Sequence, residues 1–285
     1  MTGLTYGGYL HLDELLGAQR PVSGHPDELL FVVAHQASEL WLKLVLHELR
    51  RVQGALAADE LRPALKGLAR VKHVQRVLTD QWAVLATLTP SEYAEFRGSL
   101  GTSSGFQSDQ YRAVEFVLGH KDARLLAMFD GDPRAKALLT ELLDRPSLYD
   151  EFLRHLARRG LPVPREVLDR DVREPHTFHP ELVTTFRPVY RDPRRHWDVY
   201  EACEELVDLE ENFQLWRFRH LQTVERTIGA KRGTGGSAGV SFLRRALEHG
   251  FFPELYAVRA EIGTEIGTEV DTAIGTEIDP AIGER

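Results

Sequence analysis

The 285-residue chain is predicted to be all-α, and three observations support this prediction. Apolar residues recur along most of the chain at the i, i+3, i+4, i+7 spacing of amphipathic helices. Sustained alternation of apolar and polar residues, which is typical of β-strands, is nearly absent. Turn sequences such as Thr89-Pro90 and Asp130-Gly131 separate the helical patterns. We therefore expect a single multi-helix, bundle-like domain over residues 1–259.

The clearest helical pattern runs from Asp27 to Val52. Its apolar residues stand at positions 30, 33, 34, 37, 40, 41, 44 and 45, and Asp27 and Glu28 suit the positive end of a helix dipole. Similar patterns predict helices over about 62–87, 107–119, 134–143, 147–159 and 196–228.

Two segments differ from the helical body. Residues 160–195 are rich in proline, arginine and histidine, which predicts an irregular or short-helix connector without a domain boundary. Residues 260–285 repeat Ile-Gly-Thr-Glu and carry seven acids against Arg285 alone, a net charge of −6 out of −8 for the chain. Such acidic, low-complexity composition predicts a disordered tail with no catalytic role.

Composition excludes several classes of protein. Hydrophobic residues make up 42% and charged residues 27%, as in soluble globular proteins. No basic stripe is present, so we expect no nucleic-acid partner. We expect no signal peptide and no membrane, because neither a leader pattern nor about 18 uncharged apolar residues in succession occurs. Cys203 is the single cysteine, which rules out internal disulfides and thiolate metal clusters and fits a cytoplasmic location.

A glycine-rich stretch from Gly233 to Ala238 formally matches the dinucleotide-binding pattern GxGxxA. That pattern requires a preceding strand, whereas the residues before it read as a helix with a glycine stop. A P-loop is also excluded, because Lys231 precedes the glycines instead of following them. On these residues alone, the stretch reads as a flexible surface loop.

Histidines on apolar helix faces are the next candidates. A di-iron site is disfavoured, because none of the twelve histidines has a glutamate three residues before it. His35 follows Phe31 by one turn, and His220 follows Trp216 by one turn. Spacing alone leaves open whether they are haem ligands or packed core residues.

Tyr93 and Arg97 are i, i+4 neighbours on a predicted helix that ends near residues 98–101. Together they could present a phenol and a guanidinium to one carboxylate. A solvated arginine beside a packed tyrosine remains the alternative.

Taken jointly and in order, five segments resemble the tryptophan 2,3-dioxygenase family, whose members are haem enzymes that open the indole ring of L-tryptophan with O₂. The resemblance covers nearly all of residues 5–259. Its most specific parts are HQASELW and the fourteen-residue step from His220 to Thr234. The five segments are TYGGYLHLDELL, HPDELLFVVAHQASELWLKL, YAEFRGSLGTSSGFQSDQYR, WRFRHLQTVERTIGAKRGTGGSAG and FPELYAVR.

The resemblance implies a haem site. His220 would bind the iron as the proximal ligand through a neutral imidazole. Phe31 and His35 would face the distal side, where His35 would accept a hydrogen bond from the indole N–H. Ser104 and Gly105 would line the pocket near both haem and substrate.

The resemblance also implies how the amino acid is held. Arg97 and Tyr93 would bind the substrate carboxylate, and Thr234 would contact its ammonium group together with a haem propionate. Residues from the N-terminal segment of a neighbouring subunit would close the pocket, namely Tyr6, Tyr9 and Leu10. This arrangement implies a homotetramer.

The implied activity is cleavage of the indole C2–C3 bond of L-tryptophan to give N-formyl-L-kynurenine, the first step of tryptophan catabolism by the kynurenine pathway. The implied cofactor is haem b, one per subunit and ferrous in the active form. Two alternatives remain: a relative that inserts one oxygen atom, and a non-catalytic haem carrier or sensor. Asp109, Val240 and Phe242 depart from the family pattern, the first as an expected surface change and the others in packing behind the glycine loop.

Overall fold

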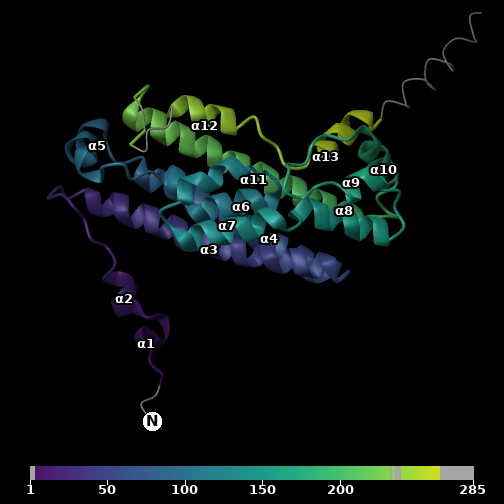
Figure 1. Ribbon diagram of the computed structural model, residues 1–285, viewed down its shortest axis with the longest axis horizontal. Coiled ribbons are helices and arrows are strands. Elements are labelled where there is room, and N and C mark those ends of the chain that lie inside the picture. The colour runs from purple at the N-terminus through teal and green to yellow at the C-terminus, as the bar shows by residue number, and fades with distance from the viewer. Residues whose placement is uncertain (1–3, 232, 235–238, 264–285) are drawn as a thin grey trace, which may run out of the picture.

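The computed structural model describes residues 4–231, 233–234 and 239–263, and every regular element within these residues is helical (Figure 1). Three long helices run along the body and form its frame: α3 (Glu28–Ala57), α4 (Leu61–Leu85) and α11 (Trp197–Ile228). Helices α6 (Asp109–Leu118), α7 (Pro133–Asp144) and α8 (Leu148–Arg158) complete the bundle. The predicted all-α architecture is confirmed, and the predicted helices are present.

Helix α3 contributes two different faces. Its second half buries apolar residues at helical spacing, including Leu42, Leu49 and Leu56, against α4, α6 and α8. In its first half, Leu29 and Val33 are each nearly half exposed to solvent. By length and composition alone α3 could cross a membrane, which differs from the expectation that no such stretch exists. Core helices of soluble proteins meet the same criterion.

The short helix α5 (Pro90–Arg97) presents two of the candidate site residues. Thr89 caps its first turn in a reciprocal capping box with Glu92, and Pro90 occupies the first helical position. The helix ends at Arg97, next to the predicted end near residues 98–101, and a 3₁₀ turn, η1 (Gly98–Leu100), follows it. A second 3₁₀ turn, η2 (Gly105–Gln107), follows and is capped by Ser104.

The prediction for residues 160–195 is partly wrong. Helix α9 (Arg165–Leu168) is short, but α10 (Pro180–Arg191) is a regular amphipathic helix that buries Phe186 and Val189 in the core. The prolines misled the prediction because Pro180 is in the first helical position, where no N–H donor is needed. The other proline, Pro188, lies in the last turn. Helix α10 packs against α11, α13 (Pro253–Ala257) and η4 (Val258–Glu261).

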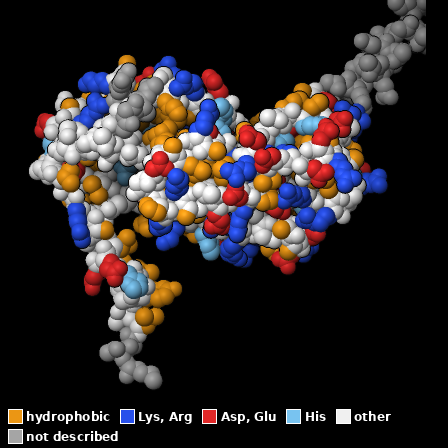
Figure 2. Space-filling model, in the orientation of Figure 1, with side chains coloured by type: hydrophobic (Ala, Val, Ile, Leu, Met, Phe, Trp, Pro, Cys, Tyr) orange, Lys and Arg blue, Asp and Glu red, His pale blue; other side chains and the backbone are white. Residues whose placement is uncertain are grey.

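The N-terminal helices α1 (Tyr6–Leu10) and α2 (Leu12–Leu16) form an arm that extends away from the body (Figure 1). The arm carries several exposed hydrophobic side chains (Figure 2). At the other end of the chain, Glu261 pairs with Arg187 at 2.6 Å, two residues past the expected domain boundary. The predicted tail from residue 264 onward lies outside the described residues, as do residues 232 and 235–238 of the glycine loop.

Candidate functional site

A cavity of about 1210 Å³ lies at the α5 end of the bundle. Its walls come from α3, α4, α6 and α11, and the segments around η2 and α12 (Val240–Ala246) complete them. Ligand pockets of proteins typically measure about 300–1,000 Å³. The cavity therefore has room for more than one small molecule.

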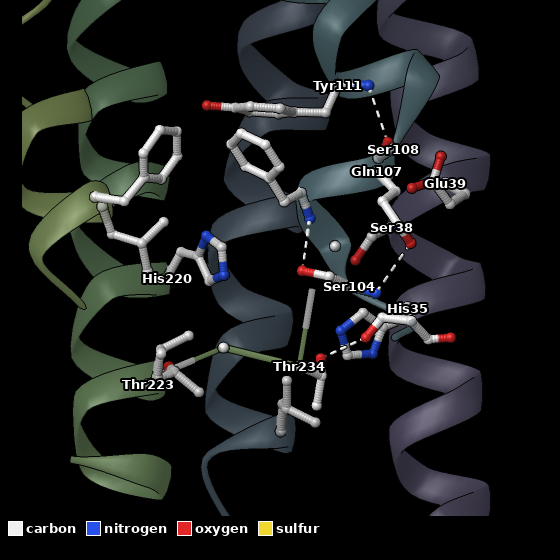
Figure 3. Close-up of a pocket in the computed structure, with 18 of the residues that line it drawn as sticks. His35, Ser38, Glu39, Ser104, Gln107, Ser108, Tyr111, His220, Thr223 and Thr234 are labelled. Carbon is white, nitrogen blue, oxygen red and sulfur yellow. Dashed lines mark hydrogen bonds between the residues drawn. The ribbon is translucent and has the colours of Figure 1, made fainter. Parts of the chain in front are cut away.

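His220 reaches this cavity from α11 (Figure 3). Its ring stacks on Trp82 of α4, with centroids 4.6 Å apart and planes 9° from parallel, and Trp216 lies 5.5 Å away. Burial, helped by the nearby His35, lowers the pKa of His220 to about 4. The imidazole is therefore neutral at pH 7, the form that binds metals.

His35 faces the same cavity from α3, on the side opposite His220 (Figure 3). Its Nδ1 lies 2.7 Å from the carbonyl oxygen of Phe31. Because a carbonyl can only accept, Nδ1 carries the proton and Nε2 keeps its lone pair. Burial lowers the pKa of His35, although the Phe31 carbonyl and Glu39 oppose this shift. The residue is thus a neutral hydrogen-bond acceptor at its Nε2 atom.

Tyr93 and Arg97 both line the cavity from α5, one helical turn apart. The Tyr93 ring packs on Phe31 at 5.8 Å and meets Phe96 edge-on at 5.4 Å. Burial raises the pKa of the Tyr93 phenol, and Arg97 opposes the shift. A neutral phenol beside a guanidinium fork is suited to one carboxylate.

The turn before α6 forms another part of the wall. The Ser104 hydroxyl accepts from the amide of Phe106 at 3.3 Å, which holds the turn in place. A Cβ added at Gly105 would meet no atom of the other described residues within 4 Å, its chain neighbours aside, so this glycine borders open space. The Thr234 hydroxyl donates to the carbonyl of Ser103, which brings the glycine-rich segment to this turn.

The predicted residues of the N-terminal segment are not brought to the cavity of their own chain. Tyr6, Tyr9 and Leu10 lie on α1, where they are 77%, 67% and 40% exposed. They do not line the cavity. Their expected role requires a second copy of the chain and stays a prediction.

Several cavity residues escaped the sequence analysis. Trp82 lies on an ordinary apolar helix stripe, where no sequence signal distinguishes it from a core residue. Phe106 meets Phe242 of α12 edge-on at 4.6 Å, as expected for packing behind the glycine loop. Asp109 does not lie on the open surface: it lines the cavity, and its 19% exposed side chain pairs with Arg134 at 3.3 Å.

The residues present fit a haem. No group of three or more histidine, cysteine or acidic side chains within the described ranges could hold a metal ion, so the protein offers isolated imidazoles. A macrocycle supplies the remaining ligands itself, and an apolar aromatic wall suits its flat faces. His220, with Trp82 and Trp216 beside it, offers this combination.

Comparisons with known proteins concern the chain as a whole. The family model described as tryptophan 2,3-dioxygenase matches residues 1–140 and 186–262. A protein of Kineococcus radiotolerans named tryptophan 2,3-dioxygenase is 70% identical over 263 residues, covering 92% of each chain. Proteins of the same name are 68% identical in Saccharopolyspora erythraea (91% of this chain, 93% of the relative) and 60% identical in an Arthrobacter species (91% and 92%).

Proposed function

This chain belongs to the tryptophan 2,3-dioxygenase family, and on that premise we propose that it oxidises L-tryptophan with O₂ to N-formyl-L-kynurenine. One observation carries the proposal. Two neutral histidines, His35 and His220, face a single cavity that also contains the Tyr93–Arg97 pair. The reaction is the first step of tryptophan catabolism by the kynurenine pathway.

His220 would hold the iron of one haem b per chain, in the ferrous state during turnover. A neutral imidazole suits this role, because protonation does not compete with the metal at pH 7. The haem, when bound, supplies the activation of O₂, which the protein's own side chains cannot perform. Ser104 and Gly105 would border both haem and substrate, where the missing side chain of Gly105 leaves space.

The amino-acid part of the substrate would be bound by charge. Arg97 would take the carboxylate through two parallel hydrogen bonds, supported by the Tyr93 hydroxyl. Thr234 would contact the ammonium group, with a haem propionate nearby. These contacts favour the free amino acid over indole, which lacks both charges.

His35 would orient the indole ring. Its Nε2 is an acceptor, because Nδ1–H is engaged by the Phe31 carbonyl, and the indole N–H is a donor. The indole N–H is a very weak acid, so His35 positions the ring and need not remove the proton. Phe31, whose ring lies 4.1 Å from that of His35, would pack on the indole.

The protein would lower the barrier mainly through proximity. Holding the indole C2–C3 bond where it can meet O₂ could contribute roughly 7 kcal/mol at best, by the effective molarity of well-oriented groups. Both oxygen atoms of O₂ enter the product, so L-tryptophan and O₂ balance N-formyl-L-kynurenine with no further reactant.

The assembly would be a homotetramer in the cytoplasm. Tyr6, Tyr9 and Leu10 lie on the exposed arm, and apolar side chains grouped in this way favour burial against a partner. We infer that they complete the pocket of a neighbouring subunit.

Product analysis separates this proposal from its alternatives. Haem-loaded, anaerobically reduced protein is mixed with L-tryptophan and ¹⁸O₂, and the product mass is measured. Two labelled oxygen atoms are expected. One labelled atom would indicate a monooxygenase, and the absence of any labelled product would indicate a haem carrier or sensor.

A further inference from the structure

One polar stripe of α11 holds the backbone that follows α12. Glu210, Gln214 and Arg217 stand at i, i+4 and i+7 and therefore share a helix face. The Glu210 carboxylate accepts from the backbone amides of Phe251 and Phe252 at 2.8 and 2.9 Å. Gln214 donates to the His249 carbonyl at 2.7 Å. Arg217 donates from Nη1 to the carbonyls of Ala246 and His249 at 2.9 and 3.0 Å.

Arg217 is the member of this stripe nearest the cavity, and it is 3% exposed. Its Nη2 donates to the Glu115 carboxylate at 2.8 Å, and its Nε donates to the Tyr111 hydroxyl at 3.2 Å. The guanidinium thus joins α11 to α6 and to the end of α12. A planar group with five donors can make these four contacts together, whereas an ammonium cannot.

The contacts of Arg217 lead to both sides of the cavity. Ala246 is the last residue of α12, whose Phe242 packs on Phe106 beside Gly105. On the other side, the Tyr111 ring lies 5.2 Å from Trp216, which is in ring contact with His220. Phe242, Trp216 and Arg217 all line the cavity.

We propose that Arg217 is a positioning residue that holds α12 at the correct distance from α11 and thereby sets the width of the substrate cavity. The inference rests on the proposed function, because the cavity is taken to bind L-tryptophan. A shift of the wall by about 1 Å can reduce catalysis by roughly 100-fold, so anchoring α12 at its last carbonyls matters for substrate fit.

Arg112 provides a matched control. It is 4% exposed and donates to the same Glu115 carboxylate at 2.6 Å. It packs over the rings of Phe106 and Tyr111, and among the described residues it donates to no carbonyl at the end of α12. Removing either guanidinium leaves Glu115 with the other, so both variants disturb the same buried ion pair.

The experiment compares Arg217→Met with Arg112→Met in haem-loaded protein. We expect both variants to lower the Tm. Arg217→Met should raise the KM for L-tryptophan about tenfold and should change kcat less. Arg112 also lines the cavity, so Arg112→Met should raise the KM as well, but by several-fold less, because it removes no contact to the end of α12. Arg217→Lys should have a KM between those of the parent and of Arg217→Met, because an ammonium can reach one carbonyl.

Equal KM values in the two methionine variants, at equal haem content, would overturn the inference. If Arg217→Met does not fold, Arg217→Lys is compared with Arg112→Lys by the same criterion. Gln214→Leu, which removes the other donor to the His249 carbonyl, should raise the KM in the same direction and by less. Failure of the parent protein to oxidise L-tryptophan would instead contradict the proposed function.

Discussion

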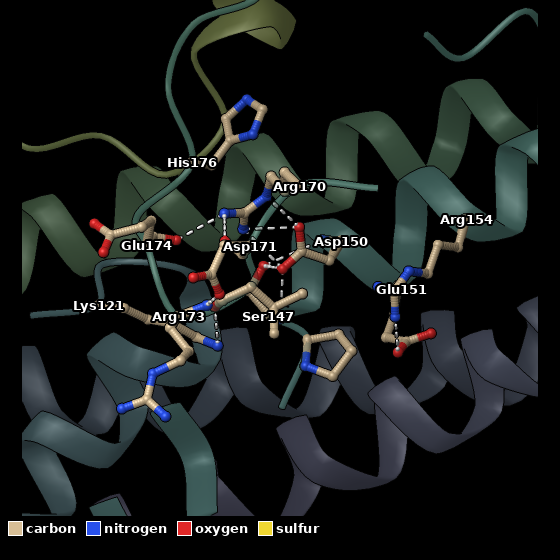
Figure 4. A network of polar contacts seen from close by, with 12 residues as sticks. Lys121, Ser147, Asp150, Glu151, Arg154, Arg170, Asp171, Arg173, Glu174 and His176 are labelled. Carbon is tan, nitrogen blue, oxygen red and sulfur yellow. Dashed lines mark hydrogen bonds and ion pairs between the residues drawn. The ribbon is translucent and has the colours of Figure 1, made fainter. Parts of the chain in front are cut away.

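The two ends of the bundle use their buried polar groups differently. On the side of α8 and residues 160–179, buried charges pair with groups inside the chain (Figure 4). The Lys121 ammonium, 2% exposed, donates to the carbonyls of Leu143, Arg145 and Val172. Arg170 binds the Asp150 carboxylate through two nitrogens at 2.8 and 2.9 Å. We call this part, with residues 160–179 at its centre, the connector end.

At the cavity end, buried charges such as Arg217 and Glu115 are also paired, but two indole N–H groups beside the cavity are not. The indole N–H groups of Trp82 and Trp216 are buried without a hydrogen-bond acceptor among the described residues. Within the same residues, His220 makes ring contacts and no hydrogen bond. Polar groups left unmatched in this way are costly unless a ligand uses the space beside them. A buried ring nitrogen of His179 also lacks a partner at the connector end, but His179 does not line the cavity. The unmatched groups at the cavity end are therefore the ones that a bound ligand can reach.

The largest expected effect on folding is at the connector end, from Glu254→Ala. The Glu254 carboxylate is fully buried and accepts from Tyr149, His176 and the amide of His179 at 2.7 to 2.9 Å. Its loss should lower the free energy of unfolding by about 3–5 kcal/mol, because buried donors lose their acceptor. Chemical denaturation measures this change. A loss of kcat/KM at unchanged stability would show that Glu254 serves the site and not the fold, contrary to this comparison.

At the cavity end, Arg97→Ala should weaken substrate binding and leave the stability of the fold nearly unchanged. Leaving the substrate carboxylate without its partner should weaken L-tryptophan binding by about 2–5 kcal/mol, with little change in the free energy of unfolding. Steady-state kinetics and denaturation give the two values. Arg165→Ala is the control, since this 93% exposed side chain pairs with Asp169 and does not line the cavity. An unchanged KM in Arg97→Ala would contradict the carboxylate assignment.

The pH dependence of turnover should reflect His35. Burial lowers the pKa of His35 below the ordinary value of 6.5, so the ring stays neutral above that pH. Protonation would place a proton on Nε2 and remove the acceptor for the indole N–H. We therefore expect kcat/KM to fall only as the pH drops below 6.5, and His35→Ala to keep reduced but measurable turnover without this decline. A decline centred above pH 6.5 would contradict this role.

The smallest effect is expected from Gly105→Ala. Apart from its chain neighbours, an added methyl group meets no atom of the described residues within 4 Å, so the free energy of unfolding should change by less than about 0.5 kcal/mol. The same methyl group would enter the cavity and raise the KM for L-tryptophan. A large loss of stability would show that Gly105 serves the fold, contrary to the comparison.

Most of the frame could be predicted from the sequence, because its signals are local. The apolar spacing gave α3, α4 and α11 to within a few residues, and the i, i+4 step paired Tyr93 with Arg97. The resemblance to a known family supplied roles for His35 and His220, which spacing alone had left open.

The connector end could not be predicted, because its contacts join residues far apart in the chain. Tyr149 and Glu254 are 105 positions apart, and Lys121 and Val172 are 51 apart. The same holds for Arg217, whose partner Glu115 lies 102 residues earlier. Helix α10 was missed for a different reason, since its prolines occupy terminal turns that tolerate them.

Haem binding tests the contrast between the two ends most directly. Apo-protein is titrated with haem and followed by the Soret band, in the parent chain and in His220→Ala, with the Tm of each apo-protein as the control. We expect one haem per chain in the parent, a Soret shift on adding L-tryptophan, and loss of most haem in His220→Ala at an unchanged apo Tm. Full haem binding with an unaltered spectrum in His220→Ala would contradict the account.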